Sequence, residues 1–233
     1  MFTLDKVVPW GRSFDEYARM FALGGADLAG RILGCADGPA SFNFEATRRG
    51  ARVISCDPLY RWTTDQIRER IRVTSEDILD QTRRNRREFN WTSIQTPERL
   101  YEIRMAAMNA FLDDFAAGTV EGRYVDAELP SLPFDDGAFD LALCSHFLFL
   151  YSAQLGDAFH RDAVREMCRV AAEVRIFPLV MLGGMRSPHV DEQVAALRAL
   201  GLESTVEGVD YEFQQGANQM LRIRRPANPV AGW

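Results

Sequence analysis

Short apolar runs alternate with amphipathic stretches along the chain, and this alternation predicts strands and helices in turn. Residues 31–35 and 53–56 are apolar, too short for a stable helix, and bounded by Gly or Asp. Between them, Ser41 is a candidate cap for a helix that ends at Gly50. Two parallel strands joined by a helix form the core of a doubly wound sheet, which binds ligands at the carboxyl ends of its strands.

The middle of the chain departs from this alternation. Residues 60–118 hold helical periodicity without a convincing strand, and helix starts are predicted at Thr63 and Thr96. The distance from Asp57 to the next strand-end acid, Asp126, is 69 residues, which is more than one crossover helix needs. We therefore expect a helical cap, inserted at about residues 60–120, over the strand ends.

The flanking regions complete the pattern. Ser13 and Glu16 form a capping-box pattern that opens an N-terminal helix. The remaining predicted elements are a strand at residues 123–126, a strand at 139–144, a helix at 162–172, a strand at 174–182, a helix from Ser187 with Leu200 on its apolar face, and an antiparallel hairpin of strands 204–213 and 219–224. The sequence therefore predicts one α/β domain over residues 1–233.

Composition narrows the class of partner. The chain has 233 residues, of which 47% are hydrophobic, enough for one domain with a sizeable core. Its net charge of −6 argues against a nucleic-acid or membrane surface as partner, so we expect a small-molecule substrate, no nucleic acid and no membrane. The four cysteines are scattered without a CxxC pair, which favours reduced core thiols in a cytoplasmic protein. No targeting segment is indicated, and no feature of the pattern assigns an oligomeric state.

Candidate binding residues follow the first two predicted strands. The turn after the first strand holds the small residues Ala36 and Gly38 around Asp37, so a ligand can approach the backbone there. The next helix start offers free N–H groups. Asp57 lies 19 residues after Gly38, the distance at which an acid of a nucleotide-binding fold meets ribose hydroxyls. The unit thus predicts a nucleotide-type ligand.

Four segments together resemble the class I S-adenosylmethionine (SAM)-dependent methyltransferases. They are ILGCADGPASF, the acid Asp57, VDAELPSLPFDDGAFDLALCSHF and EMCRVAAEVRIF, and the resemblance runs over about residues 11–225. It implies SAM as cofactor and a Rossmann-like, seven-stranded, mostly parallel sheet with an antiparallel C-terminal hairpin. The LPFDDGAFD stretch is the most specific part of the match.

The glycine-rich turn departs from the pattern of that family. The family pattern D-x-G-x-G-x-G falls on Gly34, Ala36, Gly38 and Ala40, so the first acid and two of the three glycines are missing. The first acid is the residue that contacts the methionine amino group in the family. Asp37 is the candidate to replace it.

The resemblance also implies roles for other residues. Asp57 would hold the ribose hydroxyls, Asp126 the adenine amino group, and the Ala127 backbone the adenine ring nitrogen. The complete set of predicted cofactor-binding residues is Trp10, Arg12, Tyr17, Ala36, Asp37, Gly38, Asp57, Pro58, Asp126, Ala127 and Ser145. No metal site is predicted.

Methyl transfer is an in-line displacement at a sulfonium, so the protein mainly positions the reactants and excludes water. His146, just past the fourth predicted strand, is the best acid/base candidate. Tyr17 and Tyr151 are further catalytic candidates, because aromatic faces attract a sulfonium cation. Each of these aromatic residues also fits a purely structural place in a core.

Alternative functions remain open at this point. VPWGRSFDEYARMFAL and CADGPASF resemble a bacterial branch with azetidine-2-carboxylate synthases, which cyclise SAM to azetidine-2-carboxylate and methylthioadenosine. A SAM-binding protein without catalysis is a second alternative, given the altered turn. A nicotinamide-dependent oxidoreductase is disfavoured, because Ser41 replaces the third glycine of its fingerprint and Pro39 stiffens the turn.

Overall fold

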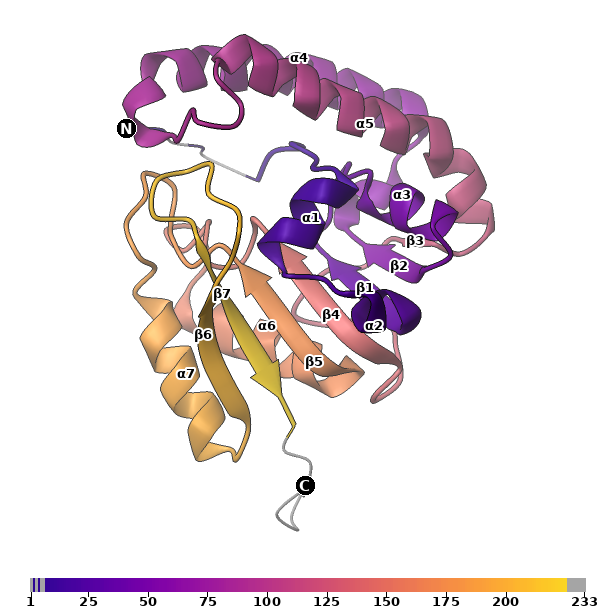
Figure 1. The fold of residues 1–233 in the computed structure, drawn as a ribbon. Coiled ribbons are helices and arrows are strands. Elements are labelled where there is room, and N and C mark those ends of the chain that lie inside the picture. Colours follow the sequence, from indigo (N-terminus) through magenta and orange to yellow (C-terminus); the bar gives the residue numbers. More distant parts are fainter. Residues whose placement is uncertain (1, 3, 5–6, 226–233) are drawn as a thin grey trace.

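The computed structural model describes residues 2, 4 and 7–225, and within them one sheet of seven strands forms the centre of the molecule (Figure 1). The strands are β1 (Arg31–Cys35), β2 (Arg52–Cys56), β3 (Tyr124–Val125), β4 (Phe139–Ser145), β5 (Ala171–Phe177), β6 (Glu203–Gly208) and β7 (Gln219–Arg224). Their order is β3-β2-β1-β4-β5-β7-β6, with β1 to β5 parallel and β7 antiparallel to both of its neighbours. This arrangement confirms the predicted fold class.

Helices cover both faces of the sheet. They are α1 (Phe14–Met20), α2 (Gly25–Ala29), α3 (Phe42–Arg48), α4 (Thr64–Arg84), α5 (Pro97–Val120), α6 (Asp157–Val170) and α7 (His189–Ala199), with 3-10 turns η1 (Pro58–Arg61) and η2 (Arg86–Glu88). α6 and α7 pack their buried side chains with Leu33 and Cys35 on one face. α1 and α3 pack with Ile32 on the other face. Because β1 is buried on both sides, its sequence reads as a continuous apolar run.

Two long helices, α4 and α5, lie side by side above the carboxyl ends of the parallel strands (Figure 1). Thr63 and Thr96 cap them by accepting hydrogen bonds from Gln66 N–H and Arg99 N–H. Their facing side chains form an apolar cluster that includes Ile67 and Phe111 and also takes in Tyr60 and Tyr124. The cap is therefore tied to the sheet through the edge strand β3.

The boundary between α6 and β5 differs from the prediction. The helix begins at Asp157 and ends at Val170, and the strand follows at Ala171 without a loop. The predicted helix at 162–172 and strand at 174–182 were therefore wrong by several residues at their ends. Gly156 at the N-cap offers no side-chain cap, so the sequence carries no start signal for this helix.

Three smaller expectations also need correction. Ser41 occupies the N-cap of α3, but its hydroxyl donates to Glu45 and caps no backbone N–H. Leu200 lies at the C-cap of α7 with 47% of its surface exposed, outside the buried stripe of that helix. The strand predicted at 204–213 is shorter in the structure: β6 ends at Gly208, where the chain turns into a long connection before β7.

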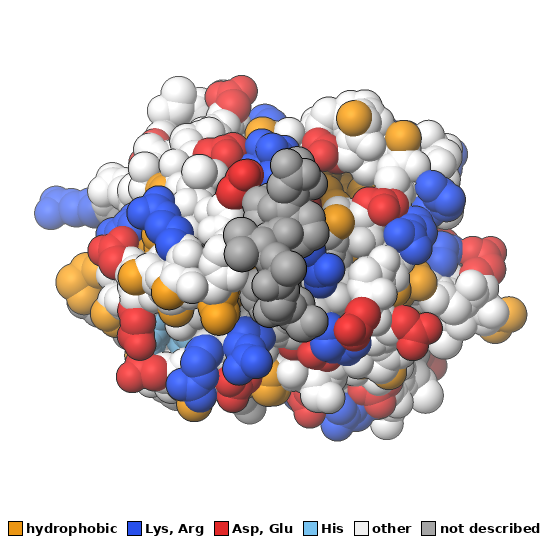
Figure 2. Space-filling model, turned by 90° about the horizontal axis from the view of Figure 1, so that it is seen from below, with side chains coloured by type: hydrophobic (Ala, Val, Ile, Leu, Met, Phe, Trp, Pro, Cys, Tyr) orange, Lys and Arg blue, Asp and Glu red, His pale blue; other side chains and the backbone are white. Residues whose placement is uncertain are grey.

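The cysteines occupy the centre of the sheet. Cys56, Cys35 and Cys144 lie in register on β2, β1 and β4, and all three are buried and unbonded. Cys168 is also free, but it is only half-buried. Of the helices that the structure describes, none combines the length and apolar character needed to cross a bilayer. On the face seen from below, side chains of both charges are interspersed (Figure 2).

Candidate functional site

A cavity of about 280 Å³ lies at the carboxyl ends of β1, β2 and β4 and is bounded by the cap through Arg61, Trp62 and Arg70. Its volume is close to the lower end of the range for ligand pockets, roughly 300 to 1,000 Å³. The predicted site residues that line it are Trp10, Arg12, Tyr17, Ala36, Asp37, Gly38, Asp57, Pro58, Ser145 and His146. The topology therefore brings most of the predicted set together.

The turn after β1 is held against the end of β2. Ala36 and Gly38 both have left-handed backbones, with φ of 55° and 54°. The Ala36 N–H donates to the Cys56 carbonyl at 2.8 Å, and the Gly38 N–H donates to Asp57 Oδ2 at 2.9 Å. Glycine adopts this conformation freely, whereas alanine pays roughly 1 kcal/mol for it. The turn is thus fixed in a tight shape by two bonds to the neighbouring strand.

Asp37 fills the space that Gly34 leaves open. A side chain begun at Gly34 would overlap with the Asp37 carboxylate. That carboxylate is buried and accepts hydrogen bonds from the Tyr17 hydroxyl at 2.8 Å and the Ser55 hydroxyl at 2.6 Å. The chain therefore places a carboxylate beside β1 from residue 37, next to the position where the methyltransferase pattern has its first acid.

Asp57 closes the site at the end of β2. Its Oδ1 accepts from the Leu59 N–H at 2.7 Å, while Oδ2 accepts from the Gly38 N–H. Tyr60 donates its hydroxyl to the Gly38 carbonyl at 2.8 Å, so the same turn is held from the cap side. Each carboxylate oxygen has two lone pairs, and Asp57 keeps acceptor capacity toward the cavity.

The carboxyl groups of Asp37 and Asp57 both have a raised pKa. Burial raises the pKa of Asp37 to about 6, against the lowering effect of hydrogen bonds from Ser55 and Tyr17. Burial likewise raises the pKa of Asp57 to about 6, despite the backbone hydrogen bonds from Leu59 and Gly38. Desolvation of a carboxylate favours its protonated form, and a cation bound between the two would reverse that effect.

A buried ion pair lies near Arg12 and joins α1 to the cap. Arg104 of α5 donates from Nη1 to both carboxylate oxygens of Glu16, at 2.7 and 2.6 Å, and the Tyr211 hydroxyl donates to Glu16 Oε1 at 2.9 Å. The side chains of Arg104 and Glu16 are 1% and 5% exposed. This network joins α1, the cap and the connection between β6 and β7.

Arg12 is a cation of the cavity with one unsatisfied buried donor. It lines the cavity and donates from Nη1 to the Trp10 carbonyl at 2.6 Å, but its Nε is buried without a hydrogen-bond partner among residues 2, 4 and 7–225. Burial, followed by repulsion from Arg104, lowers the pKa of Arg12 to about 10. A buried N–H without an acceptor is costly, so this atom is suited to an anionic ligand group.

His146 follows β4 with a left-handed backbone, φ 52°, which is uncommon for a residue other than glycine. Its Nδ1 lies 2.9 Å from the Ser145 hydroxyl. Desolvation, followed by the charges of Arg12 and Arg104, lowers its pKa well below the ordinary value. The imidazole at the cavity is therefore neutral.

Three predicted residues do not line the cavity. Asp126 is exposed and pairs with Arg61 at 3.2 Å. Ala127 packs, partly buried, against the larger core cluster. Tyr151 is buried behind the N-terminal segment, where its hydroxyl accepts from the Val8 N–H at 3.4 Å.

No protein-family model matches the sequence. The chain is 33% identical over 224 residues to the uncharacterized protein MJ0045 of Methanocaldococcus jannaschii, and the match covers 95% of this chain and 98% of that protein. The chain belongs to the family of MJ0045.

Solved structures resemble this MJ0045-family chain at low sequence identity. The magnesium protoporphyrin IX methyltransferase of Synechocystis is 12% identical with a TM-score of 0.49, covering 91% of this chain and 82% of that chain. The PH0226 protein of Pyrococcus horikoshii is 12% identical with a TM-score of 0.48, covering 91% and 89%. A SAM-dependent methyltransferase of Aquifex aeolicus is 12% identical with a TM-score of 0.40, covering 85% and 82%. These likenesses concern the fold alone.

Sequence reasoning missed several residues at the site of this MJ0045-family member. Ser55 donates to Asp37, and Arg104 anchors Glu16. Arg104 had a detectable signal, since it falls on the apolar face of α5 between Leu100 and Met108. A charge at such a position indicates a buried partner.

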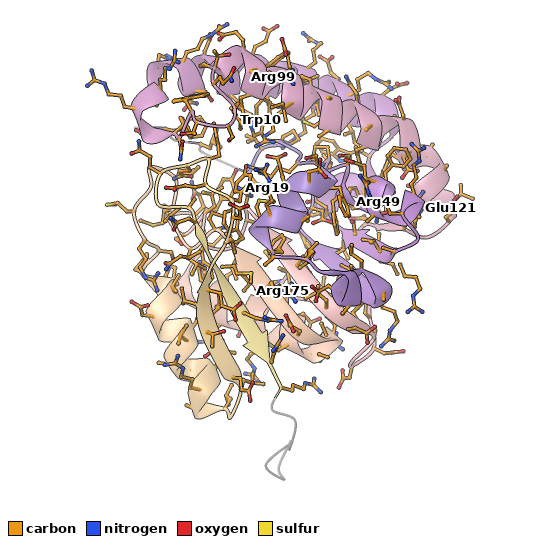
Figure 3. The ribbon with its side chains drawn as sticks, in the orientation of Figure 1. Trp10, Arg19, Arg49, Arg99, Glu121 and Arg175 are labelled. Carbon is orange, nitrogen blue, oxygen red and sulfur yellow. The ribbon has the colours of Figure 1, made fainter. Side chains whose placement is uncertain are left out.

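Trp10 also reaches the cap. It comes from the segment before α1 and lies below the cap helices (Figure 3). Its ring centroid is 6.4 Å from that of Tyr101 on α5. The N-terminal segment is therefore a wall of the cavity as well as a contact of the cap.

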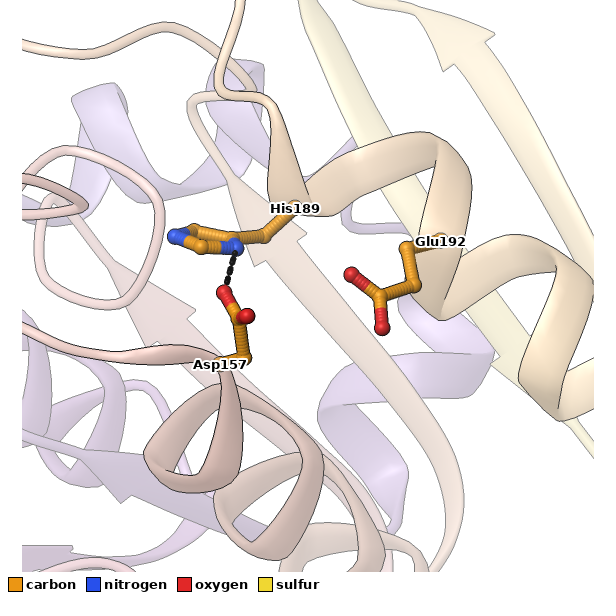
Figure 4. Close-up of side chains that lie close together, drawn as sticks. All are labelled: Asp157, His189 and Glu192. Carbon is orange, nitrogen blue, oxygen red and sulfur yellow. Dashed lines mark ion pairs between the residues drawn. The ribbon is translucent and has the colours of Figure 1, made fainter.

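A second group of titratable side chains lies away from the cavity, at the starts of α6 and α7 (Figure 4). His189 Nδ1 is 2.9 Å from Asp157 Oδ1, and Glu192 lies beside them. Asp157 and Glu192 occupy the first turns of their helices, where carboxylates stabilise free N–H groups and the helix dipole. The positions of Asp157 and Glu192 are therefore explained by their stabilisation of the two helix starts.

Proposed function

We propose that the protein binds SAM in the cavity and transfers its methyl group to a small-molecule acceptor. The observation that carries this proposal is the pair of carboxyls at the ends of β1 and β2, the buried Asp37 and the partly buried Asp57. Both have a raised pKa, and the buried, unpaired Arg12 Nε lies on the same cavity. A ligand with an ammonium, hydroxyls and a carboxylate would satisfy all three groups.

Each group suits one part of SAM. Asp37 would hold the amino group, Asp57 the ribose hydroxyls and Arg12 the carboxylate. Asp126 would accept from the adenine amino group through Oδ2 while Oδ1 stays paired with Arg61, and the Ala127 backbone would meet the adenine ring. Pro58 and Ser145 would line the cofactor, with Ala36 and Gly38 allowing close approach of the turn.

SAM supplies an activated methyl group, so the residues of the chain need to orient the two reactants, shield them from water and deprotonate the acceptor. His146, held neutral by desolvation and two nearby arginines, would accept the proton of an acceptor hydroxyl or amine. Tyr17 keeps its proton, because burial, followed by the charge of Asp37, raises its pKa well above the ordinary value. It therefore fixes Asp37 by donating a hydrogen bond. Tyr151 would have a supporting role: its hydroxyl accepts a hydrogen bond from the Val8 N–H and so holds one wall of the cavity in place.

Asp57→Ala is expected to weaken SAM binding about 10- to 100-fold, because the two ribose hydroxyls lose the carboxylate that accepts their hydrogen bonds. Isothermal titration calorimetry with SAM and S-adenosylhomocysteine (SAH) measures the effect. Asp65→Ala removes an exposed acid of the cap that pairs with Arg68; it is the matched control and should bind as the wild type does. Equal affinities of Asp57→Ala and the wild type would refute the assignment.

SAM affinity is also expected to rise between pH 5 and pH 7 by about tenfold for each of two carboxyls, about 100-fold in all. Asp37 and Asp57, each with a pKa of about 6, are protonated in the free protein at the lower pH, and the cationic ligand needs them ionised. Calorimetry in two buffers of different ionisation heat should show proton release at pH 5.5 and little at pH 7. Asp37→Asn should reduce this release, and a flat pH profile would contradict the role of the two carboxyls.

Cyclisation of SAM is a second candidate, favoured by the small cavity and by Asp37 with its pKa of about 6. The ligand's amino group would displace the sulfur at its own γ-carbon, releasing methylthioadenosine, and Asp37 would take the amino proton. Incubation with SAM alone separates the two functions. Methylthioadenosine with a cyclic amino acid supports cyclisation, whereas SAH formed only with an acceptor supports methyl transfer. Tight binding without any turnover would indicate a SAM-binding protein without catalysis.

A further inference from the structure

One arginine of the cap differs from its neighbours on α4. Arg68 pairs with Asp65, Arg72 with Glu69, and Arg83 with Asp80 and Glu98, all at the exposed surface. Arg70 is half-buried and lines the cavity, and no ion pair to it is found in the part of the chain that the structure describes. It is thus a cation that faces the site without a carboxylate.

Trp62 holds this guanidinium in place. The Arg70 Cζ lies 4.7 Å from the centroid of the Trp62 ring, and Trp62 itself packs against the apolar cluster of the cap. Stacking on an indole stabilises the guanidinium but satisfies none of its N–H donors. The five donors stay in one plane, which suits a bidentate contact with a planar anion.

The other cations at the cavity are already committed. Arg61 pairs with Asp126, and Arg12 is the group that we assign to the SAM carboxylate. The wall contributed by the N-terminal segment, residues 7–10, is apolar and ends in Trp10. Within the described part of the chain, the cap side of the cavity thus offers an apolar surface and an arginine, Arg70, without an ion pair.

We propose that Arg70, positioned by Trp62, binds a carboxylate on the acceptor, so that the acceptor is an aromatic or otherwise flat apolar acid. This inference rests on the proposed SAM-dependent function and specifies its substrate class. The apolar body packs against residues 7–10, and the carboxylate receives two N–H donors from Arg70. A neutral molecule of the same shape loses the charge-assisted bonds and binds less tightly.

The test uses 2-naphthoate and its neutral counterpart 2-naphthamide as probes on the full chain saturated with SAH. Tryptophan fluorescence and calorimetry give both dissociation constants for the wild type, Arg70→Gln, Arg70→Lys and the control Arg68→Gln. We expect the wild type and Arg68→Gln to prefer the acid about tenfold or more. Arg70→Gln should bind the two probes within about twofold of each other, and Arg70→Lys should keep part of the preference.

SAH binding is measured first for every variant, together with its thermal midpoint. A wild type that binds SAH but shows equal affinity for the two probes overturns the acid specificity and leaves the proposed function standing. If Arg70→Gln keeps the full preference for 2-naphthoate over 2-naphthamide, another residue binds the carboxylate, and the proposed role of Arg70 is overturned. Absence of SAH binding to the wild type overturns the proposed function, and the acid subsite falls with it.

Discussion

Gly34→Ala is expected to destabilise the protein by about 3 kcal/mol and to abolish measurable SAM binding. The added methyl group would overlap with the Asp37 carboxylate, which has no free space because Tyr17 and Ser55 hold it from two sides. Moving the carboxylate breaks both hydrogen bonds and displaces the proposed contact to the ligand's amino group. Chemical denaturation and calorimetry with SAM measure the two effects.

A double variant separates steric overlap from loss of the charge. Asp37→Ala removes the atoms that an alanine at residue 34 would strike, so Gly34→Ala combined with Asp37→Ala should be about as stable as Asp37→Ala alone. The overlap would then account for the cost of the single change. If the two substitutions add independently, Asp37 does not occupy the space beside Gly34 in solution.

Arg104→Met is expected to cost about 3 to 5 kcal/mol in the free energy of unfolding, because Glu16 would be left buried without its partner. Arg99→Met, on the same helix but in an exposed pair with Glu102, should cost about 0.5 kcal/mol or less (Figure 3). Urea denaturation of both variants gives the comparison. Equal costs at the two positions would show that the buried pair is not formed.

The same pair predicts an acid dependence of stability. Burial raises the pKa of Glu16, but the charge and hydrogen bonds of Arg104 outweigh it and lower the value from 4.5 to about 2. A carboxyl with a lowered folded-state pKa stabilises the protein above its unfolded value, and this contribution is lost as pH falls from 4.5 to 2. Arg104→Met should lose less stability over that interval than the wild type does.

The order of elements was predictable because apolar periodicity and capping residues act locally. Such signals are present in the strands around residues 31–35 and 53–56, in the final hairpin, and in α4 and α5, which begin at the N-cap residues Thr63 and Thr96. The α6 to β5 boundary lacks one, because Gly156 provides no cap and the helix passes directly into a strand. Leu200 shows a further limit, since one apolar residue at the end of a periodic stripe turned outward.

The site was predictable where spacing along the chain determines position in the sheet. Asp37 and Asp57 follow adjacent parallel strands, so their meeting at one edge was expected. The partnership of Gly34 with Asp37 was visible only in three dimensions, because it depends on an absent side chain. Arg70 and Trp62 lie on the cap, whose packing over the sheet has no short-range signal, and Arg70 looks in sequence like its paired neighbours.

The network of Glu16, Arg104 and Tyr211 has a consequence for synthesis of the chain. Its members are separated by 88, 107 and 195 residues, so the network joins the first, middle and last parts of the polypeptide. Contacts of such high sequence separation form late and slowly. During translation, Glu16 and Arg104 can meet before Tyr211 has left the ribosome, but the network lacks its third member until then. The link between α1, the cap and the β6–β7 connection is therefore completed only near the end of synthesis, together with β7, which joins the sheet between β5 and β6.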